Sequence, residues 1–379
     1  MQKLVLTEEQ QMLKDAAQGL FGEQAPVSQL RKLRDDKDPL GYVPEFWNQA
    51  VELGLAGTLI PESHGGSEFG HVGMGQVMEE GGRTLAASPL FASGVLGACV
   101  LMLAGNDSQK ETLKGIADGS HLTALAIDET GRHQPLRVAT RAEAQGNGFV
   151  LNGSKTFVVD GHIANTLIVS ARTSGGERDE QGITLFLVDP KAEGVSVERT
   201  IFPDGRNYAK VQLQNVAVDA DAVLGEKDQG AGPLQKLLDI GSAHMAAELL
   251  GLSSEAFDRT VAYMKERKQF GVYISSFQAL QHRAAHMWSE LEQVKSMVLK
   301  AFMALDANDE QASLLARAAK AKTSQVAELV TNEGVQLHGG MGMTDEFDIG
   351  LFMKRARPAQ LLLGDFRYHA DRVASLKGF

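Results

Sequence analysis

The sequence predicts an α+β protein of three consecutive parts: an all-α domain at the N-terminus, a middle antiparallel β-barrel domain and a C-terminal four-helix bundle. Apolar residues recur at steps of three and four up to about residue 120 and again from about residue 230, as on the buried face of a helix. Between these regions lie short β-branched runs separated by turn residues, a pattern typical of strands. Because the change of period marks the boundaries, we expect domains at 1–121, 122–226 and 227–379.

The N-terminal region begins with a pattern of helix capping, in which Thr7 is followed by Glu9 and Gln10. Further helices are predicted at 46–53, 72–82 and 107–117. The Gly-rich turn PESHGG at 61–66 either connects two of these helices or lines a ligand site. The uncharged run at 89–105 is too short, and too often interrupted by glycine, to cross a membrane, so we expect a buried helix there.

The middle region has the spacing of many short strands joined by turns, of which Gly146-Asn147-Gly148 is one. Strands are predicted at 122–127, 137–143, 148–151, 156–159, 166–171, 183–188, 195–201 and 209–213. After Gly232-Pro233 the helical period returns, with long patterns at 234–268, 277–307, 311–337 and 351–376. Long helices joined by short links favour an antiparallel four-helix bundle.

Composition excludes several classes of protein. Apolar residues make up 43% of the chain and charged residues 22%, values typical of a globular protein. A formal net charge of −11 with no dense basic run argues against nucleic-acid binding, so a polyanionic ligand would be held by a few placed cations. The lone Cys99 excludes an intramolecular disulfide, and the acids near the start are untypical of a signal peptide. We therefore expect a cytosolic protein with neither membrane nor nucleic acid as partner.

The motifs of several enzyme classes are absent. The sequence has no GxSxG, GxxxxGK[ST] or CxxC pattern, and its GMG at 340–342 lies outside any strand-turn-helix unit, so a Rossmann site is not indicated. A di-iron bundle needs Glu-x-x-His on two helices, and only Glu68 with His71 has that spacing. His282 and His286 lie one helical turn apart, but no HExxH glutamate accompanies them. We therefore predict no metal site.

The segment YMKERKQFGVYISSFQ at 263–278 joins two of the long helical patterns and carries a guanidinium, an amide and an aromatic ring at Arg267, Gln269 and Phe270. Taken alone, it reads as a solvated helix end stopped by Gly271, with basic residues favouring the helix dipole. Other motifs in the chain favour a binding segment instead. They are LTEEQQ near the start, LGLAGTLIPESHGG at 53–66, MEEGGR at 78–83, LNGSKTFVVDG at 151–161 and QLHGGMGMTDEF at 336–347.

In this order and spacing, these motifs and RKQFG resemble the acyl-CoA dehydrogenase family of flavoproteins over nearly the whole chain. The resemblance implies the acyl-CoA dehydrogenase fold and FAD as cofactor. It implies that Arg267, Gln269, Phe270 and Gln278 contact FAD, largely that of a neighbouring subunit. An arginine suits a pyrophosphate because its planar guanidinium donates two hydrogen bonds at once.

The resemblance also implies FAD contacts elsewhere in the chain. Gln336, Leu337, Gly339 and Gly340 fall on the loop whose glycines admit the dinucleotide. In the middle region, Phe157 and Val159 match the positions that cover the flavin ring. Asp128, with Glu129 after it, matches the start of the family's T-E-P segment.

The implied chemistry is α,β-desaturation of an acyl-CoA thioester, in which a carboxylate takes the α proton and hydride leaves the β carbon for flavin N5. This chain departs from the family at the base. The usual glutamate of Y-E-G-T aligns with Leu363, and the alternative position near the start of the first bundle helix is Gly241, beside Ser242 in place of an arginine. Asp365 and Glu248 are the nearest acids, and if this subunit is itself catalytic we expect one of them to be the base. Asp365 is the first choice. We expect the turn at Gly364 to aim its carboxylate inward against Leu362 and Leu363, where burial would raise its pKa.

The resemblance leaves three functions open. The first is an FAD-dependent acyl-CoA dehydrogenase that passes electrons to an electron-transfer flavoprotein, in β-oxidation of fatty acids or sterol side chains. The second is a catalytically silent subunit that completes a shared FAD site in a heteromer. The third is a flavin oxidase or monooxygenase on the same fold. All three imply a homo-oligomer, dimer or tetramer, or a heteromer with a second acyl-CoA dehydrogenase subunit.

Overall fold

The first helix begins at the capping residue that the sequence predicts. The computed structural model describes residues 4–379, and in it the Thr7 side chain accepts a hydrogen bond from Gln10 N while the Gln10 side chain accepts one from Thr7 N. The N-terminal helices are α1 (Glu8–Gln24), α2 (Val27–Asp35), α3 (Pro44–Glu52), α4 (Gly70–Thr84), α5 (Ala98–Ala104), α6 (Asp107–Lys110) and α7 (Thr112–Ala117). The helix expected at 107–117 is thus two short helices. The uncharged run is a buried π-helix, Leu90–Gly97, continued by α5.

The middle region is one eight-stranded sheet. Its strands are β1 (Thr123–Ala126), β2 (Arg141–Gln145), β3 (Gly148–Val159), β4 (Thr166–Arg172), β5 (Ile183–Val188), β6 (Val195–Ile201), β7 (Asn207–Asp219) and β8 (Val223–Leu224). The order is β6-β7-β3-β2-β4-β5-β8, with β1 paired to β4 off this path. The runs predicted at 148–151 and 156–159 are one strand, β3, because irregular pairing with β7 bends it without ending it.

The expectation of a purely antiparallel middle region is wrong for β1. Thr123 to Ala126 pair in parallel with Thr166 to Val169, and β2 meets β4 in parallel at Arg141 and Arg172. A parallel neighbour requires a crossover connection, and the β2–β3 hairpin lies in the chain between β1 and β4. The remaining pairs are antiparallel.

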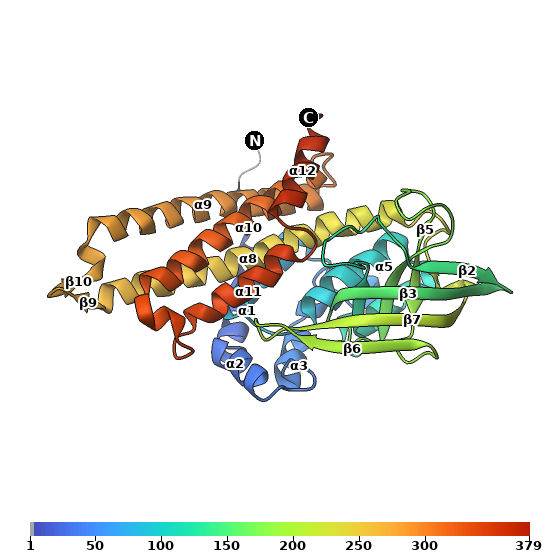
Figure 1. Ribbon diagram of the computed structural model, residues 1–379, viewed down its shortest axis with the longest axis horizontal. Helices are drawn as coiled ribbons and strands as arrows, with labels where there is room; N and C mark the ends of the chain where they lie inside the picture. Colours follow the sequence, from blue (N-terminus) through green and yellow to red (C-terminus); the bar gives the residue numbers. More distant parts are fainter. Residues whose placement is uncertain (1–3) are drawn as a thin grey trace.

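The C-terminal region is a bundle of long helices (Figure 1). They are α8 (Ala231–Glu266), α9 (Gln278–Asp306), α10 (Ala312–Leu337), α11 (Ile349–Leu361) and α12 (Phe366–Leu376). The fourth predicted helix, at 351–376, is therefore two helices. Leu363 and Gly364 have left-handed backbones, with φ of 58° and 107°, and this conformation ends α11 before α12 begins.

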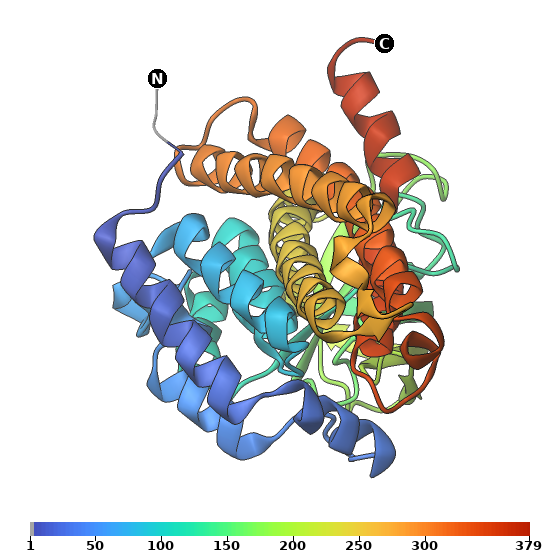
Figure 2. The same ribbon diagram turned by 90° about the vertical axis from the view of Figure 1, so that its left-hand side faces the viewer.

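The two helical regions share one hydrophobic core, because α4 packs directly on α8. The sheet has a separate core between its strands. Figure 2 shows the N-terminal helices beside the bundle, with α8 inside.

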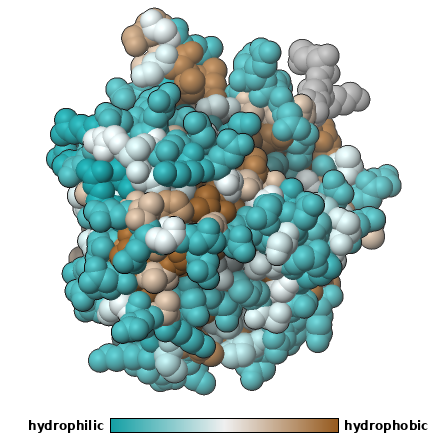
Figure 3. All heavy atoms as spheres, turned by 90° about the vertical axis from the view of Figure 1, so that its right-hand side faces the viewer, coloured by the Kyte–Doolittle hydropathy of each residue, from teal (hydrophilic) through white to brown (hydrophobic). Residues whose placement is uncertain are grey.

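The face at the sheet end of the molecule is mainly hydrophilic (Figure 3), and β6 alternates exposed with half-buried residues, as an edge strand does. The domain limits stay a prediction, with β1 beginning at Thr123 and α8 at Ala231.

At the end of the bundle remote from the sheet, the chain forms a two-stranded hairpin (Figure 1) of β9 (Lys268–Gln269) and β10 (Val272–Tyr273). Phe270 and Gly271 form its two-residue loop, with φ of 56° and 82°. Two successive positive φ angles are those of the type I′ turn that suits a tight hairpin. Gly271 tolerates this conformation, whereas Phe270 adopts it at a cost.

Candidate functional site

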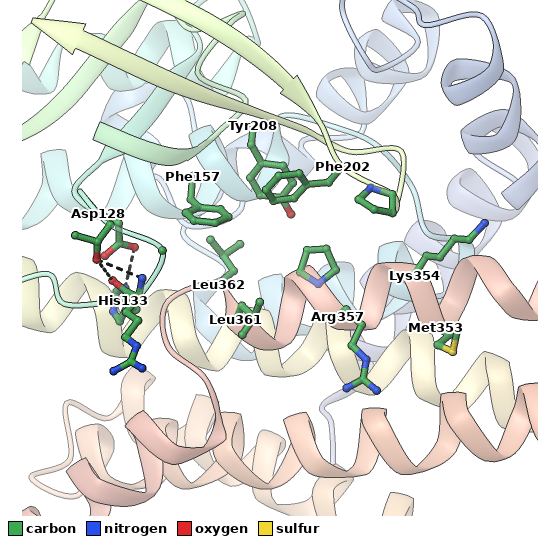
Figure 4. Close-up of a pocket in the computed structure, with 15 residues that line it drawn as sticks. Asp128, His133, Phe157, Phe202, Tyr208, Met353, Lys354, Arg357, Leu361 and Leu362 are labelled. Atoms are coloured by element: carbon green, nitrogen blue, oxygen red, sulfur yellow. Dashed lines mark hydrogen bonds and ion pairs between the residues drawn. The ribbon is translucent and has the colours of Figure 1, made fainter. Parts of the chain in front are cut away.

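An apolar cleft lies between the sheet and the bundle (Figure 4). Its volume is about 470 Å³, within the range of small-molecule sites. Aromatic rings from the sheet form one wall and α11 forms the other. The lining includes Asp128, Thr130, Gly131, Arg132, His133, Phe157, Phe202, Pro203, Tyr208, Met353, Lys354, Arg357, Pro358, Leu361 and Leu362. A planar, largely apolar ring system, such as the expected flavin, matches these walls.

Phe157 reaches this cleft from a distorted position in β3. Its φ is 55°, which is unusual for an aromatic residue, and the β3–β7 register shifts between Lys155 and Val158. A bulge of this kind re-aims a side chain. The Phe157 ring meets Phe202 edge-on with centroids 5.5 Å apart, and Phe202 packs on Tyr208 at 4.4 Å. The structure therefore places Phe157 in the aromatic wall of the apolar cleft, and its contact with a flavin stays a prediction.

Asp128 and His133 close one end of the cleft (Figure 4). His133 Nδ1 lies 2.9 Å from Asp128 Oδ2, and Asp128 Oδ1 accepts a 3.3 Å hydrogen bond from Gln134 N. The His133 side chain is only 5% exposed, and its Nε2 is buried with no partner among the residues described. The His133 ring also meets the edge of Tyr368 at 4.9 Å.

A buried ion pair fixes the loop that carries these two residues. Glu129 accepts hydrogen bonds from Ala139 N, Thr140 N and Lys155 Nζ at 2.7, 3.0 and 2.7 Å. Lys155 is fully buried and also donates to Ser170 Oγ at 3.0 Å. Because every one of these groups has a partner, the loop is held rigidly against the sheet.

A second cleft, of about 460 Å³, adjoins the first at His133. Four arginines line it, Arg137, Arg178, Arg317 and Arg372, together with His133, Gln134, Pro135, Leu136, Gln235, Leu238 and Tyr368. Arg317 is paired with Asp239 at 2.7 Å, and Arg137 lies 3.6 Å from Glu177. Arg178 and Arg372 are therefore the arginines of this cleft that are more available to a ligand. An excess of guanidinium groups in a cleft favours a phosphate-bearing ligand.

Positions 241 and 363, where the resemblance implies the catalytic base, lie next to each other in the structure. Both hold apolar residues. A side chain added at Gly241 would come within 2.6 Å of Leu363 Cδ1 and 2.7 Å of Leu96 Cδ2. Leu363 is buried, and its left-handed backbone turns the side chain onto α8. Residues 122 positions apart in the chain thus share one small apolar contact that contains no carboxylate.

The structure contradicts the raised pKa that was expected of Glu248 as a base. Its carboxylate receives Arg355 Nε at 2.7 Å and lies 3.6 Å from Arg206, while Arg355 also pairs with Asp204 at 2.9 Å. Burial would raise the Glu248 pKa, but Arg355 and Arg206 outweigh burial and lower it. A carboxylate held ionised in this network is a buried structural charge.

Asp365 does not have the expected inward orientation either. It is the N-cap of α12, and its side chain accepts a 2.8 Å hydrogen bond from Tyr368 N. It does not line the apolar cleft. The residue is half-buried, and the expectation that its carboxylate packs inward against Leu362 and Leu363 is wrong because the first turn of α12 takes up that carboxylate.

The remaining predicted cofactor residues lie at the hairpin end of the bundle, away from both clefts. Tyr263 stacks on His338 with centroids 4.3 Å apart, and this contact joins the RKQFG segment to the QLHGG segment. The segments are mostly exposed, and Phe270 is 93% exposed. The predicted cofactor residues in these two segments are Arg267, Gln269, Phe270, Gln278, Gln336, Leu337, Gly339 and Gly340. Val159, at the end of β3, is half-buried and does not line the apolar cleft.

Sequence reasoning missed His133, because a lone histidine in a loop shows no pattern. Its spacing of five from Asp128, in a segment already matched to a flavin contact, was the available signal.

His282 and His286 are exposed, and residues 4–379 contain no group of three or more candidate metal ligands. Over the same residues, no helix is both long and apolar enough to cross a membrane.

The sequence matches three family models in succession: the acyl-CoA dehydrogenase N-terminal domain at 7–120, middle domain at 122–216 and C-terminal domain at 228–375. The 3-(aryl)acrylate reductase of Clostridium sporogenes is 32% identical, over 98% of this chain and 99% of its own. Subunit CarC of the caffeyl-CoA reductase-Etf complex of Acetobacterium woodii is 31% identical, over 84% and 86%. The solved structure of butyryl-CoA dehydrogenase from Megasphaera elsdenii has a TM-score of 0.90 and 26% identity, covering 100% of both chains.

Proposed function

Because this chain belongs to the acyl-CoA dehydrogenase family, we propose that it desaturates the α,β bond of an acyl-CoA thioester and passes the electrons to an electron-transfer flavoprotein. The family is FAD-dependent, and the chain is an oxidoreductase of this class. When bound, FAD supplies the hydride acceptor. The observation that carries the proposal is the pair of adjoining clefts, one apolar and aromatic, the other lined by arginines, which share His133.

The chain's own residues have distinct tasks in this proposal. Phe157 and the apolar side of α11, including Leu361 and Leu362, hold the flavin ring between them and exclude water from it. Arg178 and Arg372 hold the phosphates of coenzyme A, so that the thioester end points past His133 towards the flavin. The acyl group is thereby held in place before reaction, and such positioning accounts for a large share of many enzymatic rates.

The first test uses the purified full-length chain. We expect visible flavin absorbance, anaerobic bleaching of that absorbance by at least one acyl-CoA, and restoration of colour by an electron-transfer flavoprotein. Protein that stays colourless after incubation with FAD, or flavin that no acyl-CoA bleaches, would contradict the proposal. Rapid recovery of the colour with oxygen alone would instead favour the oxidase alternative.

A second test addresses the arginine-lined cleft. Arg372→Gln should weaken acyl-CoA binding roughly 10-fold or more, because a charge-assisted hydrogen bond contributes about 1.5 to 3 kcal/mol. Arg367→Gln removes an exposed arginine of the same helix that does not line the cleft, and serves as the matched control. Dissociation constants from calorimetry measure both. Equal affinities for the two variants would remove coenzyme A from this cleft.

A second candidate function, the silent subunit of a heteromer, is favoured by the contact of Leu363 with Gly241, where the resemblance places a carboxylate. Such a subunit would bind FAD with a partner but reduce none of it alone. Mixing the chain with homologous subunits from its own source and measuring acyl-CoA oxidation separates the two candidates. Activity of the isolated chain excludes the silent role, whereas activity that requires a second chain supports it.

A further inference from the structure

The Asp128–His133 pair has the geometry of a base with its acceptor atom free. Asp128 is an acceptor on both oxygens, one for Gln134 N and one for His133 Nδ1, so the proton of a neutral His133 lies on Nδ1. Nε2 then carries the lone pair. That atom is buried and has no partner among the described residues, although buried polar atoms are nearly always hydrogen-bonded. A group outside this chain is the natural partner of the unpaired nitrogen.

The position of His133 is as distinctive as its hydrogen bonding. It lines both the apolar cleft and the arginine-lined cleft, and it is the residue that their two linings share. The edge contact with Tyr368, 4.9 Å between centroids, and the bond to Asp128 fix the ring on two sides. A thioester that extends from the arginines towards the aromatic wall must therefore pass His133.

We propose that His133, oriented by Asp128, is the base that takes the α proton of the acyl thioester, in place of the carboxylate missing at positions 241 and 363. The inference rests on the proposed function. The proton of the Cα–H bond passes to His133 Nε2, and the electron pair of that bond becomes the new Cα=Cβ bond. Bound FAD would be the oxidant, because it would supply the acceptor for the hydride that leaves Cβ. Asp128 stabilises the imidazolium that forms, as a carboxylate behind a histidine does in other enzymes.

The two acids nominated from the sequence are already committed. Glu248 is held by Arg355 and Arg206, and Asp365 caps α12. Of the acids nominated from the sequence, neither presents a free carboxylate to the apolar cleft.

The decisive experiment separates proton transfer from hydride transfer. The probe is 3,3-dimethylbutanoyl-CoA, which has α hydrogens but no hydrogen on Cβ and therefore cannot be desaturated. The FAD-loaded enzyme is incubated with it in D₂O, and mass spectrometry follows deuterium entering the α position. We expect exchange by the wild type and a loss of about 100-fold or more in His133→Gln, the usual scale for a lost general base.

Two variants serve as controls. His286→Gln changes an exposed histidine of α9 and should exchange at the wild-type rate. Asp128→Asn should also lower exchange, because an amide behind His133 no longer selects the Nδ1–H form.

If His133→Gln loses flavin or folds poorly, His133→Gly with added imidazole takes its place, and recovery of exchange with imidazole supports the proposal. Failure of imidazole to rescue a folded, flavin-loaded His133→Gly would overturn it.

The outcomes also distinguish this inference from the proposed function. His133→Gln that binds the probe and exchanges at the wild-type rate overturns the role of His133 while leaving the dehydrogenase intact. A wild type that binds the probe but neither exchanges its α proton nor is bleached by any acyl-CoA overturns both and favours the silent subunit.

Discussion

Three bulky residues hold a left-handed backbone in the three segments where the resemblance implies cofactor contacts or a base. Phe157 lies in the wall of the apolar cleft, Phe270 at the tip of the hairpin and Leu363 at the missing base, with φ of 55°, 56° and 58°. Each such conformation costs about 1 to 3 kcal/mol in a residue other than glycine. Strain of this kind persists where surrounding structure enforces it, and here it directs one side chain into the cleft, one into solvent and one onto α8.

His369 should make the protein sensitive to acid. The ring is buried, neither nitrogen has a partner among the described residues, and burial together with Lys320, Arg317 and His133 lowers its pKa to about 2. The unfolded chain takes up a proton near pH 6.5, whereas the folded protein does not until about pH 2. Stability is therefore lost as pH falls below 6.5.

Between pH 7 and pH 5 this difference lowers the free energy of unfolding by about 2 kcal/mol. Urea unfolding of wild type and His369→Leu at both pH values measures it, and the variant should lack this part of the loss. A wild type and variant that lose the same stability between the two pH values would show that His369 accepts a proton when folded.

Removal of the buried charge of Lys155 should lower the stability of the protein strongly. Lys155→Met leaves Glu129 ionised and largely buried beside the cleft, and such an unpaired charge costs about 3 to 5 kcal/mol. Lys322→Met removes a more exposed lysine paired with Glu290 and should cost less than about 1 kcal/mol. Chemical denaturation of both variants checks the difference, and equal small losses would mean that water reaches Glu129.

At the scale of elements, the break between α11 and α12 forms the segment in which the resemblance implies a catalytic carboxylate and this chain has Leu363. Lys320 of α10 is fully buried and donates to Gln360 O at 2.9 Å and to Gly364 O at 3.1 Å. These bonds satisfy carbonyl groups that the end of α11 leaves unpaired. The break holds Leu363 against Gly241 and places Leu361 and Leu362 on the wall of the apolar cleft.

Gly241→Ala tests the contact between α8 and this break. The new methyl group would meet Leu363 Cδ1 at 2.6 Å and Leu96 Cδ2 at 2.7 Å, so overpacking should lower the free energy of unfolding by about 1 to 3 kcal/mol. In the background of Leu363→Ala, the same substitution should cost clearly less, because one of the two clashes is gone. Thermal and urea unfolding of the four proteins in this cycle measure the coupling, and strict additivity would refute the contact.

At the scale of the whole molecule, the predicted FAD residues are divided between two ends. Phe157 and Asp128 line the cleft beside the sheet, while Arg267, Gln269 and Phe270 lie at the opposite end of the bundle (Figure 1). Residues so placed cannot all contact the same FAD within one chain. We propose that a second copy, or a related subunit, brings its hairpin to the cleft, which would cover the exposed Phe270.

Arg267→Ala should therefore release FAD with little loss of helix content. Removal of one partner of a desolvated charge pair costs about 2 to 5 kcal/mol, enough to give colourless protein at micromolar concentration. Flavin absorbance, circular dichroism and light scattering check cofactor, fold and assembly together. Lys265→Ala, at an exposed residue of the preceding helical turn, is the control. A monomer that keeps full FAD occupancy after Arg267→Ala would refute the shared site.

The sequence alone determined the order of helical and β regions, because hydrophobic period is a local property of the chain. The same holds for the cap at Thr7 and the RKQFG and QLHGG segments, whose residue types and spacing are visible without a fold. The absence of a carboxylate at 241 and 363 was likewise visible from the sequence, and the structure added only that the two positions touch.

The tertiary structure alone decided which acids are free and where the unpaired base lies. Glu248 and Arg355 are 107 positions apart, and nothing local predicts their ion pair. The parallel pairing of β1 with β4 and the break at Leu363 also depend on distant neighbours, since register and helix ends are settled by packing as much as by propensity. His133 became a candidate base only when folding buried its Nε2 between two clefts, because desolvation and hydrogen bonding are properties of the surroundings and not of the residue.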